Sequence, residues 1–95
     1  MSRPRGARTA MLNVLLGMAQ LTDINALEAY WLADPDWKLY VEVPDYGSNT
    51  AVIDAALAAV VAAVPLGDGV SASDIVCIEP GTYTRARKDE ESYRL

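Results

Sequence analysis

The segment from Thr50 to Val64 limits the fold of this chain more than any other feature, because it predicts a helix with almost no polar side. Thirteen of its fifteen residues are apolar, Ser48 or Asn49 is placed to cap its start, and Pro65 ends it. A helix that is apolar all round is normally buried all round. We expect its large residues to form one stripe that lies on a sheet: Ile53, Leu57, Val60, Val61 and Val64.

The small side of this helix needs a second partner. It consists of Ala55, Ala58, Ala59 and Ala62. A chain of 95 residues has too little structure to cover both sides of such a helix. We therefore expect the alanine face to be a subunit interface. The alternative is an exposed alanine face that serves helix propensity alone.

A β-hairpin is predicted before this helix. From Trp37 to Val43, apolar residues at odd positions alternate with Lys38, Tyr40 and Glu42, which face the other way. The preceding sequence Asp34-Pro35-Asp36 is a strong turn signal. The segment before the turn is ambiguous between helix and strand, and we expect a strand from Leu27 to Ala33 because it would complete the hairpin.

The chain starts with a predicted helix from Arg5 to Gln20, in which Gly17 is unfavourable. Its core side is expected to hold Ala7, Met11, Val14, Leu15 and Met18. The whole order predicts an α/β (α+β) fold with a helix, a β-hairpin, a helix packed on a small, mostly antiparallel sheet, and closing strands. The closing part comprises a loop (66–73), a short strand (74–79), a turn at Pro80-Gly81, a β-prone stretch (82–87) and a last strand (92–95).

Charge is separated along the chain. Residues 1–8 hold three arginines and no acid, whereas residues 9–84 hold ten acids and one base, a net charge of −9. We predict a basic N-terminal arm (1–8) followed by a single α/β domain (9–95). Arg3, Arg5 and Arg8 are expected to dock on the acidic body of another copy, with phosphate as the alternative partner. An acidic body argues against specific nucleic-acid binding, which needs clustered Lys and Arg.

Catalytic chemistry finds little support in the sequence. The absence of histidine removes the commonest general base and the histidine-ligated metals. The lone Cys77 lies in an apolar run and is expected to be buried and inert, and Gly67-Asp68-Gly69 lacks the spacing and lysine of a phosphate loop. Glu42 and Glu79 could form a carboxylate pair, although their spacing does not show that they meet. We expect no enzyme activity, no metal and no cofactor.

Two apolar stretches are too short to cross a membrane. The stretch from Ala10 to Leu21 follows three arginines, as in a secretory signal, but Asn13 and Gly17 interrupt it and no small-residue cleavage site follows. The stretch from Ala51 to Leu66 is also short and contains Asp54. We expect neither a cleaved signal nor a membrane anchor.

The second half of the chain resembles a known family in element order. Its runs are Trp37-Lys38-Leu39-Tyr40-Val41-Glu42-Val43, the long Ala/Val-rich helix, Ile75-Val76-Cys77-Ile78-Glu79-Pro80-Gly81-Thr82-Tyr83-Thr84 and Glu91-Ser92-Tyr93-Arg94-Leu95. Together they resemble tail terminator and tail-completion proteins of long-tailed bacteriophages. The resemblance implies a virion protein, assembled in the host cytoplasm, that forms a ring (a hexamer in that family) at the end of the tail tube.

The partners implied are other copies of the chain and adjacent neck or tail-tube proteins. A stretch near Val52 to Asp74 also resembles the C-terminal part of phage baseplate J-type proteins. The alternative function is a small acidic protein-binding module, similar to an immunity or regulatory protein, that acts as a monomer or dimer. Such a module would use the same acidic surface to meet a basic target.

Overall fold

A computed structural model describes residues 6–32, 37–64, 66, 70–88 and 91–95. Within these residues the chain forms helices and strands in the order α, β, β, α, β, α, β, with two short 3-10 turns, η1 and η2. The elements are α1 (Ala7–Thr22), β1 (Glu28–Leu32), β2 (Lys38–Glu42), η1 (Tyr46–Ser48), α2 (Thr50–Ala63), η2 (Ala72–Asp74), β3 (Ile75–Ile78), α3 (Arg85–Lys88) and β4 (Ser92–Arg94).

The strands form one mixed sheet in the order β3-β2-β1-β4. Strand β1 is antiparallel to both β2 and β4, while β2 is parallel to β3. The parallel pair follows from the long connection through α2, because only adjacent antiparallel strands can be joined by a short turn. The predicted α+β fold, with its hairpin and its mostly antiparallel sheet, is confirmed.

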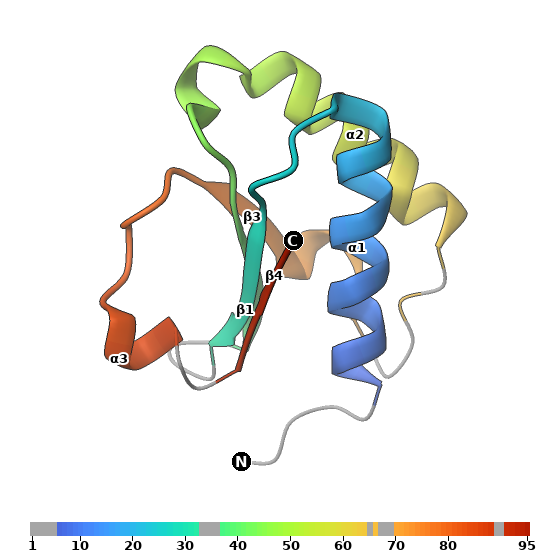
Figure 1. Ribbon diagram of the computed structural model, residues 1–95. Coiled ribbons are helices and arrows are strands. Elements are labelled where there is room, and N and C mark those ends of the chain that lie inside the picture. Colours follow the sequence, from blue (N-terminus) through green and yellow to red (C-terminus); the bar gives the residue numbers. More distant parts are fainter. Residues whose placement is uncertain (1–5, 33–36, 65, 67–69, 89–90) are drawn as a thin grey trace.

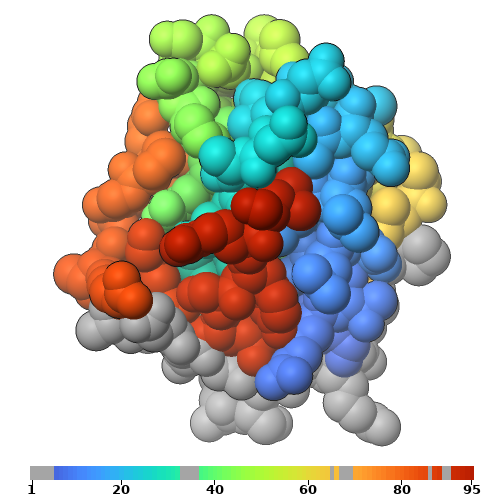
Figure 2. Space-filling view, in the orientation of Figure 1, coloured from blue at the N-terminus to red at the C-terminus, as the bar shows by residue number. Residues whose placement is uncertain are grey.

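The molecule has three layers (Figure 1). Helices α1 and α2 cover one face of the sheet, and α3 lies on the other. The space-filling view shows the C-terminal strand β4 beside α1 (Figure 2). The main core fills the space between the two long helices and the sheet, where Met11, Val14, Leu15, Trp31 and Val41 are all at most 1% exposed. A smaller cluster on the opposite face is built on Tyr30, Leu32 and Tyr40.

Helix α1 extends two residues beyond its predicted end. It follows Gly6, whose φ of 81° lies in the left-handed region, and it closes where the Asp23 N–H donates to the Ala19 carbonyl. The predicted start at Arg5 lies outside the described residues. The whole predicted core side is buried, as expected: Ala7, Met11, Val14, Leu15 and Met18.

Helix α2 is confirmed to within one residue. Ile53 and Val60 of the large stripe are buried, and Leu57, Val61 and Val64 pack against the same core while remaining partly exposed. Asn49 occupies the N-cap position but its side chain makes no capping hydrogen bond to the helix. Its amide nitrogen instead donates to the Asp45 carbonyl at 2.9 Å, because η1 already turns the chain into the helix.

Two local predictions were wrong. Residues 85–87, part of the stretch expected to be β-prone (82–87), lie with Lys88 in the one-turn helix α3, in which the backbone N–H groups of Arg87 and Lys88 donate to the Thr84 carbonyl. The outer edge of β1 is occupied by β4, so this stretch has no strand to join there, and it crosses the sheet face instead. Trp37 lies outside β2, with a left-handed φ of 55°. The predicted turn at 34–36 lies outside the described residues.

Candidate functional site

The solvent side of the two long helices carries exposed apolar residues that nothing in the described part of the chain covers. The exposed fractions of Leu12, Leu16, Leu21 and Val52 lie between 45% and 57%. All four alanines of the predicted interface are also exposed. We call this set the helix-side surface: Leu12, Leu16 and Leu21 of α1, and Val52, Ala55, Ala58, Ala59 and Ala62 of α2.

Close packing of the two helices shapes this surface. Gly17 of α1 has no side chain, and the Val60 side chain of α2 packs directly against it. Beside this crossing, Leu21, Val52, Ala55, Ala56 and Ala59 line a shallow hollow of about 370 Å³. Its lining contains no charged or polar side chain, so its chemistry suits an apolar partner surface.

Charge is nearly absent from the same helices. From Thr9 to Thr22, α1 contains no charged residue, and Asp54 is the one charged residue of α2. The Asp54 carboxylate accepts a hydrogen bond from the Tyr46 hydroxyl at 3.0 Å. Desolvation and this carboxylate raise the pKa of Tyr46, so the hydroxyl stays protonated and keeps donating. The eight residues of the helix-side surface therefore carry no charge that a partner would have to bury.

The predicted basic arm is only partly described. Arg8 is the second residue of α1, and its guanidinium lies 3.5 Å from the Glu91 carboxylate of the same chain. Its side chain remains 77% exposed, so this ion pair is weak. Arg3 and Arg5 lie outside the described residues. Docking of the arm on another copy stays a prediction, as does the role of the alanine face as an interface.

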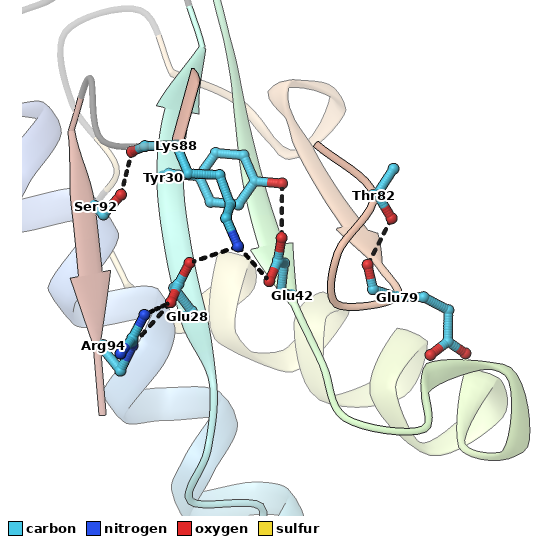
Figure 3. A network of polar contacts seen from close by, with 8 residues as sticks. All are labelled: Glu28, Tyr30, Glu42, Glu79, Thr82, Lys88, Ser92 and Arg94. Carbon is cyan, nitrogen blue, oxygen red and sulfur yellow. Dashed lines mark hydrogen bonds and ion pairs between the residues drawn. The ribbon is translucent and has the colours of Figure 1, made fainter. Parts of the chain in front are cut away.

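A buried polar network lies on the opposite face of the sheet (Figure 3). Glu28 of β1 and Glu42 of β2 are directly paired across the hairpin and are 8% and 4% exposed. The Lys88 ammonium lies 3.4 Å from one carboxylate oxygen of each glutamate. The Tyr30 hydroxyl donates to Glu42 at 3.1 Å, and the Arg94 guanidinium donates through Nε to Glu28 at 2.8 Å.

This network was missed in the sequence, although a signal for it exists. The register of the hairpin is symmetric about residue 35, so Glu28 must face Glu42 once the turn at 34–36 is assumed. The carboxylate pair left open in the sequence was a different one, Glu42 with Glu79, and these two side chains have different partners. Glu79 accepts a hydrogen bond from the Gly47 N–H at 2.6 Å, whereas Glu42 is bound to Tyr30 and Lys88.

The network is built for neutralisation rather than for proton transfer. Two buried carboxylates meet two cations, the largely buried Lys88 and Arg94, whose side chain is 75% exposed, so the charges of the network balance. Desolvation, followed by the negative charge of Glu42, raises the pKa of Tyr30 far above its ordinary value and keeps its hydroxyl a donor. Among the described residues, no group of three or more acidic or cysteine side chains could hold a metal ion.

Cys77 of β3 is half-buried against the main core, rather than fully buried as expected. Desolvation raises the pKa of its thiol to about 11. Because the thiolate is the reactive form, this thiol is a poor nucleophile at neutral pH.

Two indole groups have no hydrogen-bond partner. The Nε1 atoms of Trp31 and Trp37 are buried donors without an acceptor, and their rings lie 6.0 Å apart. The structure offers no physical account of these two unmade bonds.

The comparisons with known proteins do not identify a relative. No family profile matches the chain, and no curated protein or solved structure is similar to it. In the described part of the chain, no helix is both long enough and apolar enough to cross a membrane.

Proposed function

We propose that this chain is a non-enzymatic structural protein of a phage virion, of the tail terminator or head-to-tail neck type, and that its copies assemble into a ring at the end of the tail tube. The helix-side surface is the observation that carries this proposal. Four large apolar side chains, each about half exposed, lie on helices that are almost free of charge. Exposed apolar area of this kind is typical of surfaces that meet another protein.

A closed ring can use a surface of modest strength. Full burial of a leucine or valine side chain contributes about 1.5–3 kcal/mol, so four half-exposed side chains supply roughly 4 kcal/mol. Association itself costs about 4–15 kcal/mol. One such contact is therefore marginal. In a closed ring each copy makes two contacts, and a copy leaves only when both break.

The charge of the body agrees with a position around DNA. Residues 9–84 carry a net charge of −9, and like charges prevent DNA from adhering to the wall of a channel. Residues 85–95 do not reverse this charge, because their four bases and three acids add a net charge of only +1.

Measuring the mass of the purified protein tests the proposal. We expect sedimentation equilibrium to show one closed oligomer that forms cooperatively, and negative-stain electron microscopy to show rings, with six members as the family resemblance implies. A protein that stays monomeric at a concentration of about 100 µM, well above the dissociation constants of stable interfaces, would contradict the proposal.

The second candidate is a small acidic protein-binding module. The excess of acid in residues 9–84 favours it, because such a surface attracts a basic target and speeds encounter with it. This candidate predicts a monomer or dimer, and its helix-side surface would meet a different protein. The same sedimentation experiment distinguishes the two functions.

A further inference from the structure

The second face of the sheet is closed by a short stretch of chain. Tyr30, Leu32 and Tyr40 on this face are 0%, 2% and 6% exposed. Part of what buries them is the stretch from Tyr83 to Lys88, which contains α3 and which we call the cover (Figures 1 and 3). A four-residue helix has no stability of its own, so the cover stays in place through its side-chain contacts.

Tyr83 and Lys88 of the cover both contact the sheet face, and the Lys88 carbonyl accepts a hydrogen bond from the Ser92 hydroxyl of β4. The Tyr83 ring packs edge-on against Tyr40, with ring centroids 5.0 Å apart, and against Tyr30 at 6.2 Å. The Lys88 ammonium lies 3.4 Å from the carboxylates of Glu28 and Glu42. It also lies over the Tyr30 ring, 6.0 Å from the centroid.

The ends of the cover are held independently of these contacts. On one side β3 is paired with β2. On the other side β4 is paired with β1, and backbone bonds join Trp31 N–H to the Glu91 carbonyl and Leu95 N–H to the Leu27 carbonyl. The cover can therefore leave the sheet face without removing a strand from the sheet.

A point of rotation is present at Gly81. Its φ of 86° lies in the left-handed region, and a Cβ placed there would meet nothing within 4 Å. The backbone at Gly81 is thus surrounded by open space. Pro80, Thr82 and Thr84 around it are also exposed. Rotation here breaks one hydrogen bond, which the Thr82 hydroxyl donates to the Glu79 carbonyl at 2.5 Å (Figure 3).

We infer that the cover opens as a unit about Gly81 and that Lys88 is the latch that holds it shut. With Lys88 in place, the paired glutamates are neutralised and buried. Without its charge, Glu28 keeps Arg94, but Glu42 is left with no cation and needs water, which opening of the cover supplies. The open state exposes two carboxylates beside two tyrosine rings. This device is independent of the proposed ring.

Hydrogen exchange of single amides, followed by NMR, tests the latch on the full chain. The amides of Arg87 and Lys88, which are bonded to Thr84, report the cover, and the amides of Trp31 and Leu95 report the sheet. In Lys88→Met we expect the cover amides to exchange at least tenfold faster than in the wild type, with the sheet amides unchanged. Lys88→Arg, which keeps the charge, should restore slow exchange.

Lys38→Met is the matched control, because it removes the same charge from β2, where Lys38 donates to the Ser73 carbonyl instead. It should leave exchange of the cover unchanged. Equal exchange rates in Lys88→Met and wild type would show that Lys88 is no latch. Equal acceleration of cover and sheet amides would show that the variant loosens the whole fold. If Lys88→Met does not fold, the same exchange rates are measured in the wild-type protein. Opening as a unit requires that the Arg87 and Lys88 amides be equally protected from exchange, and that both be less protected than the sheet amides.

Discussion

Gly17 of α1 lies so close to Val60 of α2 that a Cβ on Gly17 would come within 2.8 Å of Val60 Cγ2. Val60 is 2% exposed, and its branched side chain cannot turn away easily. A residue that is unfavourable within an isolated helix is therefore required by the packing of two helices. The hollow lined by Leu21 of α1 and Val52 of α2 involves the same two helices, so their close approach links the fold to the proposed interface.

We expect Gly17→Ala to destabilise the protein. Overpacking against Val60 costs about 1–3 kcal/mol, whereas the gain in helix propensity is about 1 kcal/mol. Urea denaturation followed by circular dichroism measures the change. Val60→Ala removes the colliding methyl groups, so the double variant should be more stable than the sum of the single changes predicts. A Gly17→Ala protein as stable as the wild type would contradict the close contact.

Ala58→Glu and Ala62→Glu test the helix-side surface. Both alanines are exposed, so a glutamate leaves the monomer folded, but in an assembled ring its charge would be buried without a partner. We expect sedimentation to show loss of the oligomer, with an unchanged circular dichroism spectrum. Ala26→Glu, at an exposed position before β1, is the control and should assemble. Normal assembly of Ala58→Glu and Ala62→Glu would place this face in solvent.

Periodicity predicted the elements that build the main core. The large stripe of α2 lies on the core as expected, and the alternation in β2 directs Leu39 and Val41 toward the helices. Both patterns depend on local spacing, which is visible in one chain. The turn signal at residues 34–36 then made the hairpin predictable, including the strand that begins at Glu28.

The buried network could not be predicted in the same way. Glu28 and Glu42 follow from the hairpin register, but Lys88 reaches them from 46 residues beyond Glu42. Such a contact depends on the path of the chain across the sheet face. Local β propensity also led to a wrong prediction for residues 85–87. The contacts of Tyr83 and Lys88 with the sheet face decide the conformation of this stretch instead.

Tyr30→Phe is expected to change the alkaline stability of the fold. Burial and Glu42 raise the pKa of Tyr30 in the folded state, while in the unfolded chain it titrates near 10. Unfolding therefore releases a proton above about pH 10, and the stability that Tyr30 provides below this pH is lost as the pH rises. Between pH 8 and 11, the free energy of unfolding measured by urea denaturation should fall less steeply with pH in Tyr30→Phe than in the wild type.

At neutral pH the same variant should cost about 1 kcal/mol, because Glu42 loses one donor but keeps Lys88. Cys77 titrates in the same direction, so the difference between variant and wild type is the quantity to compare. If the free energy of unfolding changes with pH in parallel for the two proteins, Tyr30 does not contribute to the pH dependence of stability.

The Cys77 thiol is expected to react slowly. Its pKa of about 11 leaves little thiolate at neutral pH, so the rate of labelling by an alkylating reagent should rise about tenfold per pH unit up to pH 10. Cys77→Ala should fold and assemble, at a cost of about 1 kcal/mol or less from lost burial. Labelling at pH 7 as fast as that of a free thiol would contradict the structural role.

The basic arm is expected to strengthen association between copies. Because Ala7 is buried and Arg8 is paired with Glu91, deletion of residues 1–8 would also damage α1. The sharper variant is therefore Arg3→Ser with Arg5→Ser, and Arg8→Ser is its matched control. We expect the double variant to fold normally and to associate more weakly, with a deficit that shrinks as salt rises, since screening removes the attraction between the arm and the acidic body.

Three charges beside an acidic body should bind no measurable duplex DNA near physiological salt. A double variant that assembles like the wild type, while losing a DNA affinity that the wild type has, would instead assign the arm to nucleic acid.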